Sequence, residues 1–586
     1  MLKLFKNLRK KDLILIFFII LLVICQVWLE LKMPDYMSAI TRLVQTEGSE
    51  MSEIVKNGGY MLACSVGSLI AAVITGYLTS YVSSQLTMNV REKLFEKVES
   101  LSMQEIKGFS TSSLITRTTN DITQVQMIVA MGLQLILKAP ITAIWAITKI
   151  LNKSWQWSTA TAVAVVILLS VIGALVTIVV PKFKIVQKLT DKLNGVTRSN
   201  LTGIRVVRAF NAEKFETKKF EDVNNFLTNQ QLFNQKTFAI MQPVMYLIMY
   251  GLTLSIYAIG AFLIKDAAMA DKIGLFGDMV VFSSYAMQII MSFLMLAMIF
   301  MMFPRAQVSA NRINEVLETE VSVKEGSLSK DLTEEKGTIE FKNVSFKYPG
   351  AEEYLLKNLS FKINQGETAA VIGSTGSGKS TLINLVPRFY DATEGEVLVD
   401  GVNVKEYKQE SLNNKIGYVP QKAVIFSNTV AGNVAYGDNG KGEITEAKVK
   451  EAIEVAQAKD FVEKMDDKYD SDIAQGGTNV SGGQKQRLAI ARAIARDPEI
   501  YIFDDSFSAL DYKTDSILRK ELKRYTSKAT SLIVAQRIGT IINADKIIVL
   551  DNGEIVGMGT HKELLKNCEV YKEIALSQLS KDELAS

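Results

Sequence analysis

The stretch TAAVIGSTGSGKSTLINLV, residues 368–386, decides the fold of the C-terminal half of the sequence. It reads as an apolar strand, a glycine-rich turn and the start of a helix. Gly373, Gly378, Lys379 and Ser380 match the pattern G-x-x-x-x-G-K-[ST]. In that pattern, backbone N–H groups and a helix N-terminus hold phosphate groups, the lysine reaches further phosphate oxygens, and the hydroxyl binds Mg²⁺. The stretch therefore predicts an α/β domain that binds a phosphate compound with Mg²⁺.

A second apolar strand, EIYIFDD at residues 499–505, ends in two aspartates, Asp504 and Asp505. A phosphate-loop site needs a carboxylate to hold Mg²⁺, and this strand end supplies it. We therefore expect Ser380 and Asp504 to be Mg²⁺ ligands.

Between these motifs lies NVSGGQKQRLAIARAIARDP, residues 479–498, where Ser481, Gly482 and Gly483 open a helix rich in alanine and arginine. Small residues at a helix N-terminus offer another phosphate site, although Ser481 taken alone is more simply an N-cap. The order of phosphate loop, Ser-Gly-Gly helix start and aspartate strand is far more specific than any one of the three. We therefore assign this helix start to nucleotide binding.

The chain has 586 residues, too many for one hydrophobic core, so we expect two or more domains. Long, almost uncharged runs fill the sequence to about residue 305, whereas the part from about residue 320 onward has the mixed charge of an α/β domain. The segment SVKEGSLSKDLTEEKG, residues 322–337, is the expected linker. A net charge of +4 is near neutral for this length, so the sequence gives no reason to expect a nucleic-acid partner.

Six apolar stretches in the N-terminal part are long enough to cross about 30 Å of hydrocarbon as helices. They are residues 13–33, 57–83, 126–149, 157–181, 242–264 and 277–303. Cations crowd the segment before the first stretch, which places the N-terminus in the cytoplasm by the positive-inside rule. Six spans return the chain to the cytoplasm. The charged segments 84–125 and 182–241 fall on the same side, and we expect them to form long helices that project toward the C-terminal domain.

The whole chain resembles a half-size ABC exporter of the bacterial multidrug type. VSGGQ at 480–484 resembles the family signature, Gln421 in IGYVPQKAVIFSNTV the Q-loop, and Tyr348 in VSFKYPG the aromatic residue that stacks on adenine. SALD at 508–511 resembles the D-loop. GFSTSSLITRTTND (108–121) and LTGIRVVRAFNAEKFE (201–216) resemble the two intracellular loops whose short coupling helices contact the cassettes.

The resemblance implies a six-helix transmembrane domain with two intracellular loops at residues 1–310, a linker at 311–335 and an α/β P-loop ATP-binding cassette at 336–586. It also implies that two cassettes close head to tail on two ATP molecules, each held between the phosphate loop of one cassette and the signature of the other. The residues that it assigns to ATP are Tyr348, Gly373, Ser374, Thr375, Gly376, Ser377, Gly378, Lys379, Ser380, Thr381, Gln421, Ser481, Gly482, Gly483 and Gln484. Those that it assigns to Mg²⁺ are Ser380, Gln421 and Asp504.

Two positions depart from the family pattern. The residue after the Mg²⁺-site aspartate is normally a glutamate that polarises the attacking water, and here it is Asp505, one methylene shorter. The family's switch histidine is replaced by Gln536 in SLIVAQRIGTI; glutamine donates a hydrogen bond but carries no positive charge. Harmless drift in a homodimer is one explanation. We favour the other, in which the chain is the degenerate partner in a heterodimer with a second half-transporter that retains the glutamate and the histidine.

The favoured function is ATP-driven export of amphipathic or hydrophobic small molecules from the plasma membrane, with both termini cytoplasmic and membrane lipids in contact with the spans. A lipid or lipopeptide flippase is the first alternative, and an ATP-gated channel or a regulatory subunit is the second. The direction of transport rests on the resemblance, and the sequence identifies no substrate.

The spacing of methionines and a lysine in the predicted spans can each be interpreted in two ways. Methionines recur at helical spacing in or beside span five, at Met241, Met245 and Met249, and in span six, at Met291, Met295, Met298 and Met302. Such side chains can repack around dissimilar apolar ligands, but lipid-facing or interhelical packing is the simpler interpretation. Lys138, in span three, is costly in lipid, so we expect it to face a water-filled cavity or to snorkel, with a substrate role as the lesser alternative.

Overall fold

The computed structural model describes residues 1–46, 48–151, 153–268, 271–329 and 335–579. The chain divides into two compact units. The helical unit consists of Met1–Glu99 and Thr111–Thr319, and the α/β unit of Ser100–Ser110 and Glu320–Ser586. The short segment Ser100–Ser110 therefore packs with the α/β unit, although it lies inside the sequence of the helical one.

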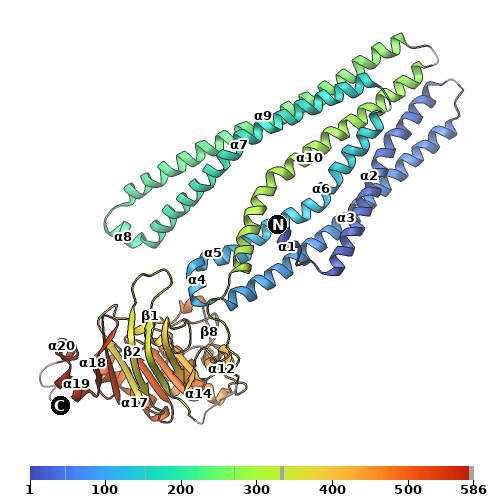
Figure 1. The fold of residues 1–586 in the computed structure, drawn as a ribbon. Coiled ribbons are helices and arrows are strands. Elements are labelled where there is room, and N and C mark those ends of the chain that lie inside the picture. The colour runs from blue at the N-terminus through green and yellow to red at the C-terminus, as the bar shows by residue number, and fades with distance from the viewer. Residues whose placement is uncertain (47, 152, 269–270, 330–334, 580–586) are drawn as a thin grey trace. The chain divides into compact units, whose positions relative to one another are not determined.

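Long helices build the helical unit (Figure 1). Its elements are α1 (Leu2–Phe5), α2 (Lys10–Gln45), α3 (Met51–Ser100), α5 (Thr111–Thr116), a π-helical turn at Arg117–Asp121, α6 (Ile122–Leu151), α7 (Trp155–Thr202), α8 (Ile204–Ala209), α9 (Glu213–Asp266) and α10 (Lys272–Glu318). Six of the helices in the described residues are long and apolar enough to cross a membrane, which confirms the six predicted spans. Helix α3 has 50 residues and α9 has 54, far more than the roughly 20 that a membrane needs.

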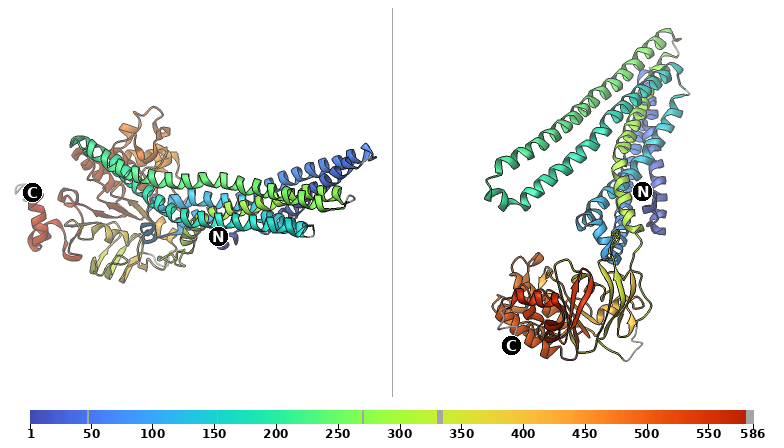
Figure 2. Two further views of the ribbon diagram at one scale, coloured as in Figure 1. Left: turned by 90° about the horizontal axis from the view of Figure 1, so that it is seen from above. Right: turned by 60° about the vertical axis from the view of Figure 1, so that its left-hand side comes forward.

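Helices α7 and α9 lie side by side as an antiparallel pair, and the second view in Figure 2 shows the same arrangement. Trp157 of α7 joins this pair to α10. Its indole Nε1 donates a hydrogen bond to the carbonyl of Ile256 in α9 at 3.0 Å, and its ring lies 5.4 Å from the ring of Phe282 in α10. Trp157 is 1% exposed, so one buried aromatic side chain satisfies its N–H and fills the space between three helices.

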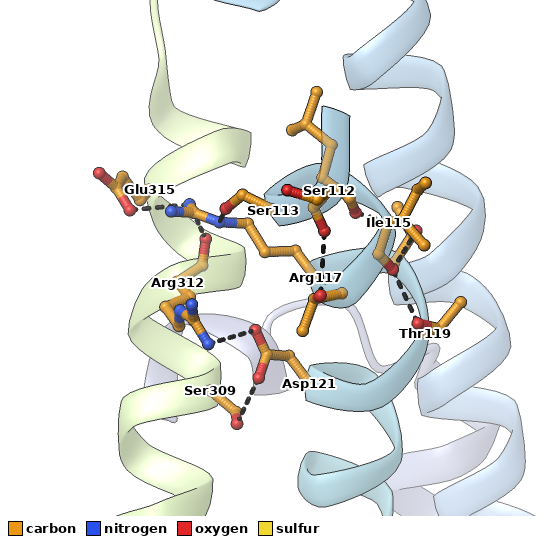
Figure 3. A network of polar contacts seen from close by, with 12 residues as sticks. Ser112, Ser113, Ile115, Arg117, Thr119, Asp121, Ser309, Arg312 and Glu315 are labelled. Atoms are coloured by element: carbon orange, nitrogen blue, oxygen red, sulfur yellow. Dashed lines mark hydrogen bonds and ion pairs between the residues drawn. The ribbon is translucent and has the colours of Figure 1, made fainter. Parts of the chain in front are cut away.

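A buried polar network fastens the start of α6 to α10 (Figure 3). Arg117 and Asp121 stand at the two ends of the π-helical turn, and both are buried. The Asp121 carboxylate accepts a hydrogen bond from Ser309 at 2.8 Å and lies 3.5 Å from the Arg312 guanidinium. Arg117 donates to the Arg312 carbonyl and pairs with Glu315, both at 2.7 Å. Because the π turn directs both charged groups toward α10, the network ties the start of α6 to α10.

The α/β unit contains two sheets. Its strands are β1 (Ile339–Phe346), β2 (Leu356–Ile363), β3 (Thr368–Gly373), β4 (Glu394–Val399), β5 (Val402–Asn403), β6 (Ile416–Val419), β7 (Asn428–Thr429), β8 (Asp472–Ile473), β9 (Ile500–Asp504), β10 (Thr530–Val534), β11 (Lys546–Asp551) and β12 (Glu554–Gly559). One sheet has the order β2-β1-β4-β5 and is antiparallel; the other has the order β12-β11-β3-β10-β9-β6. Strands β7 and β8 pair separately.

Helices surround these sheets. They are α4 (Met103–Phe109), α11 (Lys379–Asn384), α12 (Gln409–Asn414), α13 (Val430–Val434), α14 (Glu446–Val455), α15 (Lys459–Val462), α16 (Gly482–Ala495), α17 (Tyr512–Tyr525), α18 (Ile538–Ile541), α19 (His561–Asn567) and α20 (Glu569–Gln578), with 3-10 turns at Lys468–Asp470 and Gln475–Gly477. Together with the six membrane helices, this confirms the predicted fold class: a transmembrane helical domain fused to an α/β domain.

Strands β11, β3, β10, β9 and β6 of the larger sheet are parallel. Strand β9 is buried at every residue and β3 at its four central ones, as expected for parallel strands covered on both faces. Parallel strands end on the same edge of a sheet, and ligands bind outside that edge. The segments that follow β3, β9, β10 and β6 therefore meet at one place.

We expect Asp121→Ala to lower the stability of the helical unit by about 2–3 kcal/mol, because it removes the acceptor of a buried hydroxyl and one member of a partly buried ion pair. Glu315→Gln is the matched control. Its carboxylate also pairs with an arginine, but it is 59% exposed, so its loss should cost only about 0–1 kcal/mol. Thermal unfolding of both variants in detergent measures the difference. Equal shifts would contradict a network whose strength depends on burial.

Candidate functional site

The phosphate loop connects β3 to α11 and has the backbone that the sequence pattern predicts. Gly376 and Gly378 have φ of +87° and +97°, a region that favours glycine. A Cβ atom at Gly373 would collide with the carbonyl oxygen of Leu550, because the loop begins against β11. Ser374, Thr375 and Gly376 are exposed, so the outer side of the loop is open to a ligand.

Lys379 folds back over this loop. Its Nζ donates to the carbonyls of Gly373 at 2.9 Å and Ser374 at 2.7 Å. Burial lowers the pKa of Lys379, while the nearby charges of Asp505 and Asp504 act in the opposite direction. A phosphate anion in the loop would give this ammonium a stronger partner than two neutral carbonyls.

Two of the three expected Mg²⁺ ligands, Ser380 and Asp504, are in direct contact. Ser380 Oγ, in α11, donates to Asp504 Oδ1, at the end of β9, at 2.8 Å. Burial raises the pKa of Asp504, the hydrogen bond from Ser380 lowers it, and the charge of Asp505 raises it further. A cation would relieve this crowding of negative charge, and hydroxyl and carboxylate oxygens are the ligands that Mg²⁺ prefers. In the described part of the chain, the buried Ser377 hydroxyl has no hydrogen-bond partner, which fits a loop that closes around a ligand.

Asp505 is held by two glutamine side chains, Gln421 and Gln536. Gln421 Nε2 and Gln536 Nε2 donate to the same oxygen, Asp505 Oδ2, at 3.1 and 2.7 Å. Gln421 lies two residues after β6, and Gln536 two residues after β10. The sheet thus brings the two departures from the family pattern, Asp505 and Gln536, into direct contact. The sequence located both residues but gave no sign that they bond to each other.

Tyr348, the expected adenine-stacking residue, lies next to the phosphate loop. Its hydroxyl is 2.9 Å from the Thr381 hydroxyl. Lys107 of α4 places its ammonium 5.1 Å from the centre of the Tyr348 ring and 5.4 Å from that of Tyr390. The neighbouring Tyr390 raises the pKa of Lys107. Sequence reasoning missed Lys107; the only available signal was the Ser102–Glu105 capping box that starts α4.

The predicted signature forms the exposed start of α16. Ser481 is the N-cap: its hydroxyl accepts from the Gln484 N–H at 3.3 Å, and its own N–H donates to Gln484 Oε1 at 2.8 Å. Nothing lies within 4 Å of a Cβ added at Gly482, and Ser481 and Gly482 are exposed. This helix start therefore has the open surface that an anion needs.

The helical unit has a cavity of about 790 Å³. One side is apolar, formed by residues of α6 from Ile128 to Leu137 together with Phe303 of α10. The other end is polar and follows the C-terminal part of α10, with Gln307, Asn311, Asn314, Glu315 and Glu318. The described methionines highlighted in the sequence do not line this cavity: Met249 is buried in the core, and Met291 and Met298 are exposed. Sequence reasoning missed the polar stripe, although its helical spacing was visible.

Two family models match the sequence. The model described as "ABC transporter" matches residues 356–508, and the model described as "ABC transporter transmembrane region" matches residues 16–293. An uncharacterized ABC transporter ATP-binding protein of Mycobacterium tuberculosis is 38% identical over 93% of each chain. An ATP-dependent lipid A-core flippase of Pseudoalteromonas translucida is 32% identical over 88% of each chain. The fold also matches a bacterial Atm1-family ABC exporter solved with ATP bound: the TM-score is 0.81 at 24% identity, over 98% of this chain and 99% of that one.

We expect Ser380→Ala to weaken ATP binding roughly tenfold when Mg²⁺ is present, because a hydroxyl bonded to a charged group is lost. Binding measured in EDTA should change little. Ser527→Ala is the control, since it removes an exposed hydroxyl after α17, outside the residues assigned to ATP. Equilibrium binding of a fluorescent ATP analogue, with and without Mg²⁺, measures both. An equal loss under the two conditions would contradict the Mg²⁺ assignment.

Proposed function

Since the chain belongs to the ABC transporter family and is a half-size exporter with a transmembrane domain fused to an ATP-binding domain, we propose that it forms the degenerate subunit of a heterodimeric exporter. In this proposal it lies in the plasma membrane with both termini in the cytoplasm. It binds ATP through its phosphate loop, and Ser380, Asp504 and Gln421 serve the Mg²⁺ ion that neutralises phosphate charge. Transport is driven by ATP, and the substrates are amphipathic or hydrophobic small molecules.

The observation that carries this proposal is the environment of Asp505. Its carboxylate is one methylene shorter than glutamate, and one of its oxygens accepts from both Gln421 and Gln536. A carboxylate must reach and orient water to support hydrolysis, and a displacement of about 1 Å can cost on the order of 100-fold in rate. Gln536 supplies no positive charge to a γ-phosphate. We infer that this chain's own phosphate loop holds ATP and hydrolyses it slowly.

The signature of this chain is intact, which points to a partner. Ser481, Gly482, Gly483 and Gln484 match the family sequence, and their helix start is exposed. In a head-to-tail pair of cassettes, this helix would complete the site on the other chain. A second half-transporter that carries the glutamate and the histidine would then perform most of the hydrolysis.

On this assignment, Ser481→Ala should lower the steady-state ATPase rate of the assembled transporter more than Asp505→Asn does. The first variant damages the proposed hydrolysing site, and the second damages a site that is already slow. In Ser481→Ala, the backbone N–H of residue 481 can still donate to Gln484 Oε1, so we expect the helix start to remain folded. Circular dichroism of both variants checks their folding. The opposite ranking of the two rates would contradict the assignment.

The converse change should repair this chain's own site. We expect Asp505→Glu combined with Gln536→His to raise its hydrolysis rate by roughly 10- to 100-fold, because both catalytic groups regain their usual reach and charge. The rate is measured in a transporter whose partner has lost its own catalytic glutamate, so that only this site can contribute. Asp505→Glu alone is the intermediate control. A rate that is already high before the repair would contradict the proposed slow site.

The cavity of about 790 Å³ supports an amphipathic substrate, because it has one apolar side and one polar end. We expect Leu133→Trp, which fills the apolar side, to reduce ATP-dependent accumulation of an amphipathic dye in inverted vesicles at least threefold. Leu169→Trp, at an exposed position of α7, is the control. Equal dye accumulation by the two variants would contradict the proposal that the substrate passes through this cavity.

Lipid flipping is the second candidate function. Proteins named as ATP-dependent lipid A-core flippases are among the relatives, and a lipid is itself an amphipathic molecule that would suit the cavity. Transfer of a head-labelled lipid between leaflets, measured beside dye accumulation, separates the two functions. Ion current in a planar bilayer would instead favour an ATP-gated channel.

A further inference from the structure

An ion pair lies within the predicted membrane spans. Lys138 of α6 places its Nζ 2.8 Å from Glu30 Oε1 of α2. Lys138 falls in the predicted span 126–149 and Glu30 in the predicted span 13–33. The sequence predicts that Lys138 faces water or snorkels; the structure adds a carboxylate partner on a neighbouring helix. Charged groups at such positions are costly in hydrocarbon unless they are paired.

Two further donors converge on the same carboxylate oxygen. Gln26 Nε2 lies 2.9 Å from Glu30 Oε1, and Ser68 Oγ of α3 lies 3.2 Å from it. Gln26 is 3% exposed and Ser68 is 7% exposed, so both are buried polar residues. Three helices therefore contribute to one polar site, which we call the Glu30 site: Gln26, Glu30, Ser68 and Lys138.

The Glu30 site has unused hydrogen-bonding capacity. Within the described residues, Gln26 Oε1 is buried and has no hydrogen-bond donor. All three donors go to Oε1 of Glu30. The side chains of Lys138 and Glu30 are 19% and 23% exposed, so neither charged group is sealed away from a ligand. An unsatisfied buried amide oxygen costs free energy that a ligand N–H would recover.

A second ion pair joins the same two helices, but it has no unused carboxylate oxygen. Asp35 of α2 pairs with Lys149 of α6 at 2.9 Å through Oδ2, and its Oδ1 accepts from Tyr285 at 2.8 Å. Both oxygens of this carboxylate are therefore occupied, and Tyr285 is 0% exposed. This pair holds helices together, and it serves as an internal control for the Glu30 site.

A ligand that separates Glu30 from Lys138 must supply a new partner for each of the two charges. A ligand with one charge would satisfy one member and leave the other unpaired in a low-dielectric surrounding, which is strongly unfavourable. A ligand that carries a cation and an anion would satisfy both members at once. An ammonium ligand could also donate an N–H to Gln26 Oε1.

We propose that the Glu30 site recognises amphiphiles whose head bears both an ammonium and an anionic group. The ammonium binds Glu30 and Gln26, and the anion binds Lys138. This inference rests on the proposed function, export of amphipathic molecules, and adds the class of headgroup that is selected.

The test uses the transporter purified with whatever subunit accompanies it, in liposomes, with ATPase stimulation as the readout. The probes share one acyl chain and differ in the head: lysophosphatidylethanolamine has both charges, lysophosphatidylglycerol has an anion, and a long-chain alkylamine has a cation. We expect the first to act at a concentration roughly tenfold lower than the other two, the effect of about one charged hydrogen bond.

Single neutralisations should then invert the preference. Glu30→Gln frees Lys138 and should favour the anionic probe, whereas Lys138→Gln frees Glu30 and should favour the cationic probe. The exchange Glu30→Lys with Lys138→Glu keeps a pair and should retain the preference for the doubly charged head. Asp35→Asn with Lys149→Gln removes the control pair and should also retain it. If a single variant fails to fold, the probe preferences of the wild-type protein and of the exchanged pair still test the proposal.

Stimulation by the three probes at equal concentrations in the wild-type protein would overturn the Glu30 site and leave amphipathic export standing. A preference that survives in both single variants would do the same. Absence of stimulation by any amphiphile, together with absence of dye accumulation, would overturn the proposed function and this inference with it.

Discussion

One constraint organises the α/β unit: its parallel strands end on the same edge of the sheet, so the loops and side chains that follow the strands lie close together at that edge. Strand β3 brings the phosphate loop, β9 brings Asp504 and Asp505, and the segments after β10 and β6 bring Gln536 and Gln421. Buried carboxylates at such an edge need donors or a cation. Asp504 takes the Ser380 hydroxyl, and Asp505 takes two amides. The chemistry proposed for the site follows from how these two neighbouring carboxylates are satisfied.

The helical unit follows a different constraint, because a charge inside a membrane span is costly unless it has a partner. Glu30 pairs with Lys138 inside the predicted spans. Beyond residue 33, α2 carries two more pairs: Asp35 with Lys149, and Arg42 with Asp278, which also pairs with Lys153. Gln26, which donates to Glu30, has a buried amide oxygen without a donor in the described residues, whereas both oxygens of Asp35 are occupied. This difference separates a pair that joins helices from one that can also receive a ligand.

Much of the fold could be predicted from the sequence. The six apolar stretches became six long helices, and the motif around Lys379 became a strand, loop and helix, because hydrophobic length and glycine-rich turns are local properties. Partnerships between distant residues could not be predicted. Nothing local tells that Glu30 meets Lys138, that Lys107 lies over the Tyr348 ring, or that Gln536 bonds to Asp505. The methionine spacing was visible but did not locate the cavity, since helical periodicity does not say which face a neighbour covers.

The central claim is that this chain works beside a second, catalytically complete half-transporter. The most direct measurement is to purify the tagged chain from native membranes and determine the ratio of the proteins that accompany it. Our account predicts a second ABC half-transporter in equal amount, with glutamate and histidine at the positions that correspond to Asp505 and Gln536. Recovery of the chain only with itself would contradict the account, because those two residues would then have to serve both ATP sites.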